Sequence, residues 1–179
     1  MKKIIHSATL IILTVFSAKG QVAIGKTSVV NTSAILDFDN SLSNKRGIIL
    51  SAVDNVNNAL STVSVAHNNG TFLFDKSDNK LKMYENNTWV SLSDMTGNSA
   101  SIVANTTAES SSDQGAIIGA DTSSAKGVLV LEAPDKAMVL PWIQHPHINV
   151  KNPYPGMMCY DTASRTLAVY DGSVWNYWK

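Results

Sequence analysis

The sequence is poor in cysteine, in net charge and in long apolar runs. Cys159 is the single cysteine among 179 residues, so the fold does not rely on an internal disulfide. Basic and acidic side chains number 14 each. No positive face is therefore expected to displace counterions from a phosphate backbone, which argues against nucleic acid as a partner. The one long apolar run, at 8–16, is well short of the ~20 residues that a membrane helix needs, and no integral membrane span is predicted.

Residues 1–20 have the features of a secretory signal peptide. Lys2 and Lys3 precede the apolar run, and the small residues Ala18 and Gly20 fit a cleavage site before Gln21. Cleavage removes three lysines and leaves a net charge of 11 − 14 = −3 over about 159 residues. We expect an exported protein, at the cell surface or in the extracellular medium rather than the periplasm. An N-terminal membrane anchor is the alternative.

Groups that would support catalysis or metal binding are also scarce. There are four histidines, one of them in the signal peptide, and no Gly-x-Ser-x-Gly motif precedes a helix. His145 and His147 are two residues apart on a segment expected to be extended, but no third ligand lies at a diagnostic spacing. The acidic stretches 37–40 and 75–79 lack the glycine and terminal glutamate of a calcium loop, and turn chemistry explains them more simply. No enzyme activity, metal or cofactor is predicted.

What the sequence does contain is an internal repeat, which decides the architecture before any other feature. A stretch of 23 residues occurs twice without a gap, at 70–92 and at 156–178. The identical pairs are Gly70 and Gly156, Asp75 and Asp161, Leu81 and Leu167, Tyr84 and Tyr170, and Trp89 and Trp175.

Each copy of this stretch predicts three strands. Phe72 and Phe74, and then Leu81 and Met83, alternate with their neighbours at a period of two. Turn-forming residues lie between the strands, at 75–79 and again before the tryptophan. Each copy is therefore predicted to be a three-stranded antiparallel meander. One such meander is marginal in water, so its apolar face must be covered by the rest of its repeat, by the sister repeat or by another subunit.

The segments in front of the two stretches also correspond, so the whole unit is duplicated. Val22-Ala23-Ile24-Gly25 matches Ala116-Ile117-Ile118-Gly119, and each copy continues with an apolar segment and a charged residue leading into a strand. We predict a mainly β fold of two tandem repeats, 21–94 and 114–179. The polar segment 95–113, rich in serine, threonine and asparagine, is predicted to be the linker.

The middle of the unit differs between the copies. Residues 51–69 are polar and permit one short helix or an irregular turn, with apolar side chains three and four apart. In the second copy, prolines in 141–147 exclude a regular helix.

Aromatic residues divide into two groups. Tyr84, Trp89, Tyr170 and Trp175 recur at equivalent places and are predicted to belong to the repeat core. Trp142, Tyr177 and Trp178 have no aromatic counterpart in the first copy and are the predicted interaction residues. Cys159 takes the place of Leu73, which indicates a small buried apolar side chain; an intermolecular disulfide or a nucleophile are the alternatives.

The order of these features resembles a large group of exported surface proteins of Gram-negative bacteria whose repeats look like those of phage tail-fibre shafts and adhesin stalks. The first copy carries the resemblance in Gln21, Val22, Ile24, Gly25, Ser33, Ala34, Leu36, Asp37, Gly47, Gly70, Asp75, Tyr84 and Trp89. The second copy carries it in Gly156, Tyr160, Asp161, Tyr170, Asp171, Gly172 and Trp175. The resemblance implies a non-enzymatic β-rich structural or binding module that forms oligomers, including trimers. The chain departs from the group in lacking a Pro-Pro-Arg-Met-like entry and in having only two units.

These observations together lead to two alternative functions. The first is a non-catalytic structural or interaction protein, an accessory or adhesin-associated module of the cell surface. Its partner would be another cell-surface or secretion-machinery protein, or further copies of itself in a trimer. The alternative is a carbohydrate-binding module in which Trp142, Tyr177 and Trp178 stack on sugars.

Overall fold

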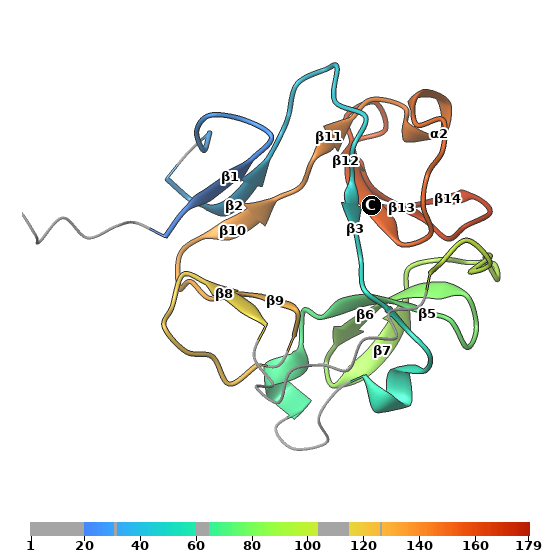
Figure 1. The fold of residues 1–179 in the computed structure, drawn as a ribbon, viewed down its shortest axis with the longest axis horizontal. Coiled ribbons are helices and arrows are strands. Elements are labelled where there is room, and N and C mark those ends of the chain that lie inside the picture. The colour runs from blue at the N-terminus through green and yellow to red at the C-terminus, as the bar shows by residue number, and fades with distance from the viewer. Residues whose placement is uncertain (1–19, 31, 60–64, 104–114, 126) are drawn as a thin grey trace, which may run out of the picture.

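The computed structural model describes residues 20–30, 32–59, 65–103, 115–125 and 127–179. It is built mainly of short strands (Figure 1), which confirms the predicted mainly β class. Helical structure in the described residues is confined to the 3-10 turns η1 (Val56–Asn58) and η2 (Val65–Asn68) and the single turn α2 (Pro146–Asn149). The signal peptide up to residue 19, and residues 104–113 of the linker, lie outside the described residues.

The strands of the described residues form four sheets, which we call A to D. Sheet A is β1 (Val22–Ile24), β2 (Ala34–Phe38) and β10 (Ala137–Val139), all parallel. Sheet B is β11 (Trp142–Ile143), β12 (Met157–Asp161), β13 (Thr166–Tyr170) and β14 (Trp175–Trp178), with β3 (Ile48–Ile49) also paired to β12. Sheet C is β4 (Ala52–Val53), β5 (Phe72–Asp75), β6 (Lys80–Glu85) and β7 (Thr88–Ser91). Sheet D is β8 (Ala116–Ile118) and β9 (Leu129–Leu131), a parallel pair.

Sheets B and C are mixed rather than purely antiparallel. In sheet C, β5, β6 and β7 run antiparallel, and the two-residue strand β4 adds to β5 in parallel. In sheet B, β12, β13 and β14 run antiparallel, β11 adds to β12 in parallel, and β3 adds to β12 antiparallel. The sequence missed β4 and β11 because two residues show no periodicity.

Both sheets pair residues in the same register. Phe74 lies opposite Leu81 in sheet C, and Tyr160 lies opposite Leu167 in sheet B. The separations are 160 − 74 = 86 and 167 − 81 = 86. Tyr84 opposite Trp89 and Tyr170 opposite Trp175 keep the same separation, since 170 − 84 = 86 and 175 − 89 = 86.

The turns between these strands depend on residues that accept positive φ. Asn79 and Arg165 end the first turn of each sheet with φ of 57° and 58°. Asn86 and Asn87, with φ of 49° and 62°, form the two-residue turn of the hairpin between β6 and β7. Gly172, with φ of 94°, serves the corresponding turn of sheet B. The turn residues of the sequence thus fix where each strand ends.

Strands from the first half of the chain (21–94) also pair with strands from the second half (114–179). β2 carries β10 on its free edge, with Leu36 opposite Met138. β3 joins sheet B, with Ile49 opposite Met157. Figure 1 shows both crossings, β10 beside β2 and β3 beside β12. The two halves are therefore interlocked through their sheets.

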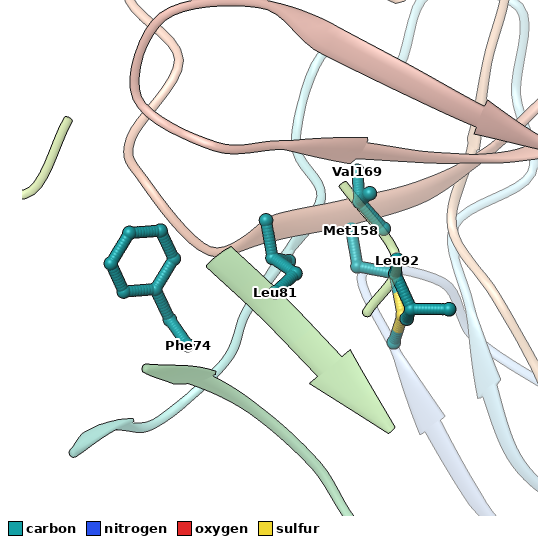
Figure 2. Close-up of a cluster of buried hydrophobic side chains, with 5 residues drawn as sticks. All are labelled: Phe74, Leu81, Leu92, Met158 and Val169. Atoms are coloured by element: carbon teal, nitrogen blue, oxygen red, sulfur yellow. The ribbon is translucent and has the colours of Figure 1, made fainter. Parts of the chain in front are cut away.

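The main hydrophobic core lies between sheets B and C and draws on both halves. Its buried side chains are Phe74, Leu81 and Leu92 from the first half and Met158 and Val169 from the second (Figure 2), each no more than 2% exposed. A smaller cluster of Ile143, Cys159 and Ala168 lies under the other face of sheet B, with Trp175 packed against it. Because one core serves both halves, neither half buries its apolar face alone.

The described part of the linker runs between the two sheets without forming a helix or strand. The Gly97 amide donates to the Asn79 carbonyl at 2.9 Å, and the Asn98 amide donates to the Asp171 carbonyl at 2.8 Å. Residues 95–103 thus contact a turn of each sheet. In 141–147, where prolines were predicted to exclude a regular helix, only the start of α2 is helical. Pro146 is at its first position, where the missing amide hydrogen costs little.

Candidate interaction surface

One face of sheet B carries a row of four large side chains, one from each of the neighbouring strands β11, β12, β13 and β14. Trp142 on β11 lies opposite Tyr160 on β12, Tyr160 lies opposite Leu167 on β13, and Leu167 lies opposite Trp178 on β14. The ring centroids of Trp142 and Tyr160 are 6.1 Å apart with the planes tilted by 48°. Trp142 is 38% exposed and Trp178 is 40% exposed. We call these four residues the aromatic row.

In the corresponding row of sheet C, three of the four residues are buried and only the first, at the edge strand β4, is exposed. The row consists of Ala52, Phe74, Leu81 and Leu92, of which the last three are at most 1% exposed. Met158 and Val169 of sheet B cover it in the main core. The two sheets thus present equivalent rows, one covered by the partner sheet and the other partly open to solvent.

Trp178 is held in place by its polar atom. Its indole Nε1 donates to the Leu92 carbonyl oxygen at 2.9 Å, across the two sheets. A buried or half-buried tryptophan normally finds such a partner for its N–H, which fixes the ring while leaving part of it exposed. Ordering the Trp178 ring in this way lowers the conformational entropy that it would lose when a partner binds.

Tyr177 does not belong to this row. It lies opposite Ala168, and successive side chains of a strand point to opposite faces of the sheet. Its hydroxyl is 2.8 Å from His147 Nδ1, and the two rings meet edge to face with centroids 6.2 Å apart. Burial raises the pKa of the Tyr177 phenol, and the nearby Asp161 carboxylate adds to that effect. The structure thus brings Trp142 and Trp178 to one face and places Tyr177 on the other.

The residues predicted to form the repeat core make two equivalent aromatic pairs. The centroids of Tyr84 and Trp89 are 5.1 Å apart, and those of Tyr170 and Trp175 are 5.4 Å apart. The first pair joins β6 to β7, and the second joins β13 to β14. Tyr84 is buried, whereas Trp89, Tyr170 and Trp175 are half-buried.

Asp75 ends β5 and Asp161 ends β12, and each organises the turn that follows. Asp75 Oδ1 accepts hydrogen bonds from the amide and the hydroxyl of Ser77. Asp161 accepts from the Ala163 amide and the Ser164 hydroxyl, and also from the His145 amide at 3.0 Å. Burial alone would raise the pKa of both carboxyls. At Asp75 the hydrogen bonds from Lys82 and then Ser77 outweigh it, and at Asp161 those from Ser164, Ala163 and His145 do so, so the pKa of each is lowered.

Lys82 adds a cation to the turn of sheet C. Its Nζ is 2.7 Å from Asp75 and 2.6 Å from Asp78. The Asp75 and Asp161 carboxylates are therefore engaged by their own turns, and Lys82 also pairs with Asp75 and Asp78.

Cys159 is fully buried in the smaller cluster beneath sheet B. Burial raises the pKa of its thiol to about 12, with a further contribution from the Asp161 carboxylate. A thiol with such a pKa is almost entirely protonated at neutral pH, and the thiolate is the reactive form. Its environment is that of a small apolar side chain.

His145 and His147 were predicted to lie on an extended segment, and this was wrong: His145 has φ of 49° and precedes the helical turn α2, which begins at Pro146 and contains His147. The rings of His145 and His147 are 6.0 Å apart and nearly perpendicular, and His147 is already engaged by Tyr177. Among the residues that the structure describes, no group of three histidine, cysteine, aspartate or glutamate side chains could hold a metal ion.

Two members of the aromatic row, Leu167 and Tyr160, were not among the predicted interaction residues. The gapless alignment of the two stretches pairs Tyr160 with Phe74, which lies in a predicted strand, and this pairing already indicated that Tyr160 belongs to a strand. What the alignment could not supply is the partner across the strands, because Trp142 reaches Tyr160 through the two-residue strand β11.

Comparison with known proteins gave no match: no family model, no curated protein and no solved structure is significantly similar to this chain. Within the described ranges, no helix has the length and apolar character needed to cross a bilayer.

Proposed function

We propose that the chain is an exported, non-catalytic interaction protein of the cell surface, built from two tandem copies of one β unit. Each unit would end in a three-stranded antiparallel meander. The observation that carries this proposal is the constant separation of 86 residues between equivalent strand pairs in sheets B and C. Identical register over three strands is what duplication of one unit produces, because a slip of one residue would turn every side chain to the other face.

The aromatic row supports an interaction role. Tryptophan and tyrosine contribute more to binding energy at protein interfaces than most other side chains. Here two tryptophans, each about two-fifths exposed, share one face with Tyr160, and the indole of one is fixed to the Leu92 carbonyl. The partner we propose is another protein of the cell surface or of the secretion machinery, or a further copy of this chain.

Photo-crosslinking in cells tests this proposal. A photoreactive amino acid is placed at Trp142 or at Trp178, and at Tyr177 as the control position on the opposite face. We expect adducts of defined mass with a protein partner from positions 142 and 178, and few from position 177. Absence of adducts from both tryptophan positions, together with a purified mature chain that remains a monomer, would contradict the interaction role.

A carbohydrate-binding function is the second candidate. It is favoured by the two half-exposed tryptophans on one face, since exposed indole rings also stack on sugars. In that case a glycan array should give binding that Trp142→Ala or Trp178→Ala abolishes. Tyr177→Ala should leave that binding unchanged, because its ring faces away. An array without any binding would remove this candidate.

A further inference from the structure

We infer that the contact between the first and second halves is repeated between copies of the chain, with β10 of one copy pairing to β5 of the next. This inference rests on the proposed duplication and names the partner. The two halves do not contact each other symmetrically. The strand edge of the second half that pairs with the first half has an equivalent in the first half that is unpaired among the described residues, and the strand that would pair with it lies in the second half.

The first unpaired element is one edge of β5. In sheet B the equivalent edge of β12 is divided: Met157 and Met158 pair with β3, and the following residues pair with β11. In sheet C the later residues of β5 pair with β4. Among the described residues, no strand pairs with the earlier part of that edge, at Thr71 and Phe72.

This open edge has the same backbone form as its paired counterpart. The Gly70 amide donates to the Tyr84 carbonyl at 2.8 Å, as the Gly156 amide does to the Tyr170 carbonyl at 2.9 Å. The amide of Thr71 is likewise bonded three residues back, at 3.1 Å, and that of Met157 at 3.0 Å. An unpaired edge of this kind is a template for an added strand.

The second unpaired element is one edge of β10, the strand that would pair with this edge of β5. Ala52 and Trp142 occupy equivalent places beside β5 and β12, which gives a separation of 142 − 52 = 90. By this separation β10, with Met138 and Val139, is the counterpart of β3. Yet β10 pairs with β2 on one side, and no second strand joins it among the described residues.

The register of the new pairing follows from β3 and β12. There Ile49 lies opposite Met157, Ile48 lies opposite Met158, and the Leu50 amide donates to the Gly156 carbonyl at 3.0 Å. The same geometry between two copies puts Val139 opposite Thr71 and Met138 opposite Phe72, antiparallel. The added strand is thus a segment of this chain with a defined register.

Two further surfaces fit the same contact. Among the described residues, sheet D has two strands, and no strand pairs with β9 on the side away from β8; Leu129 at the start of β9 is 48% exposed. In sheet A, β2 follows β1 as β9 follows β8, but β2 pairs with β10 on that side. The aromatic row is half-open, whereas Phe74, Leu81 and Leu92 of the equivalent row of sheet C are buried against sheet B. The first half of a second copy would cover both surfaces.

A contact of this kind is heterologous, because different surfaces of the two copies meet. Repeating it produces either a closed ring or an open filament. The mature chain is therefore expected to self-associate head to tail, and a monomer should be found only when the contact is blocked.

Designed cysteine pairs test the register directly. Thr71 and Val139 correspond to a pair that does not exchange hydrogen bonds, in which the side chains are closest and a disulfide is feasible. Oxidation of mature Thr71→Cys/Val139→Cys should give a disulfide between chains, seen by mass on non-reducing gels. The internal control Ile49→Cys/Met157→Cys should give a disulfide within one chain. Native Cys159 is buried in both.

An off-register variant controls for chance collisions. In Thr71→Cys/Met138→Cys the second side chain faces the opposite side of its strand, and we expect little disulfide between chains. Equal yields from both double variants, or no interchain disulfide from Thr71→Cys/Val139→Cys, would overturn the inference. Light scattering on the unmodified chain should give a mass above that of the monomer. A monomer that still gives photo-adducts with a different protein would refute self-association and leave the proposed function standing.

Discussion

Replacing Phe74 by alanine removes the largest fully buried side chain of the structure. It lies in the core that sheets B and C share, beside Leu81, Leu92, Met158 and Val169. Phenylalanine to alanine changes in a core cost about 3–5 kcal/mol, from lost apolar burial and from the cavity left behind. In a chain of this size 1 kcal/mol lowers Tm by about 2–4 °C, so the expected fall is roughly 6–20 °C.

The informative readout is whether both sheets lose stability together. Trp89 reports on sheet C and Trp175 on sheet B, so fluorine NMR of 5-fluorotryptophan-labelled protein in increasing urea follows each sheet separately. Because the core belongs to both halves, we expect one common midpoint for the two signals, and Phe74→Ala should lower it for both.

Matched variants separate this explanation from a local effect. Met158→Ala, on the opposite side of the same core, should cost about 2–5 kcal/mol of unfolding free energy and so lower the common urea midpoint as well. Tyr160→Ala, at the place equivalent to Phe74, should cost less because its row is half-open. If Phe74→Ala shifts the Trp89 signal and leaves that of Trp175 unmoved, the shared core is refuted.

Three further predictions concern local features. The pKa of Asp75 lies below its ordinary value of 3.8, so its stabilisation is full above that pH and is lost as pH falls through the native pKa; urea unfolding below about pH 5 should show this loss, reduced in Asp75→Asn. The thiol of Cys159 should resist maleimide at neutral pH until urea unfolds the chain, and fast labelling of native protein would contradict its burial. Gly172→Ala should cost more than about 1–2 kcal/mol in urea unfolding, because its φ is 94° and the added Cβ would overlap the Asn98 carbonyl; exposed Ser173→Ala is the near-neutral control.

Local signals in the sequence predicted the strands β5 and β6 and the turns beside them. Period-two alternation predicted strands at 71–74 and 81–84, and the structure has β5 at Phe72–Asp75 and β6 at Lys80–Glu85. The Asp75 turn lies between these two strands and the Asn86 turn follows β6, as expected. These features depend on neighbours in the chain, so sequence patterns carry them. The mainly β class follows from the same signals.

Long-range pairing could not be predicted in the same way. Nothing local in Ile48–Ile49 specifies that β3 joins sheet B, more than 100 residues away in the chain. The same holds for β10 on β2 and for the two-residue strands β4 and β11. The pairings of β3 and β10 connect the two halves. The sequence predicted two units one after the other, and it carried no signal for the strands that pair between them.

The interaction residues illustrate a signal that was present but not used. Tyr177 and Trp178 are consecutive in a predicted strand, and a period of two already places them on opposite faces. Grouping them into one surface therefore conflicted with the strand prediction itself. The alternative grouping of Trp142, Tyr160 and Trp178 required the strand register.

The interlocking of the two halves is tested most directly by cross-strand NOEs in the mature chain. Ile49 and Met157 form a pair that does not exchange hydrogen bonds, where Cα atoms approach to about 4.5 Å. A strong NOE between the Hα protons of Ile49 and Met157 is the predicted result. Further Hα–Hα NOEs are expected within the antiparallel pairs β12–β13 of sheet B and β5–β6 of sheet C. NOEs that connect each half only to itself would contradict the account.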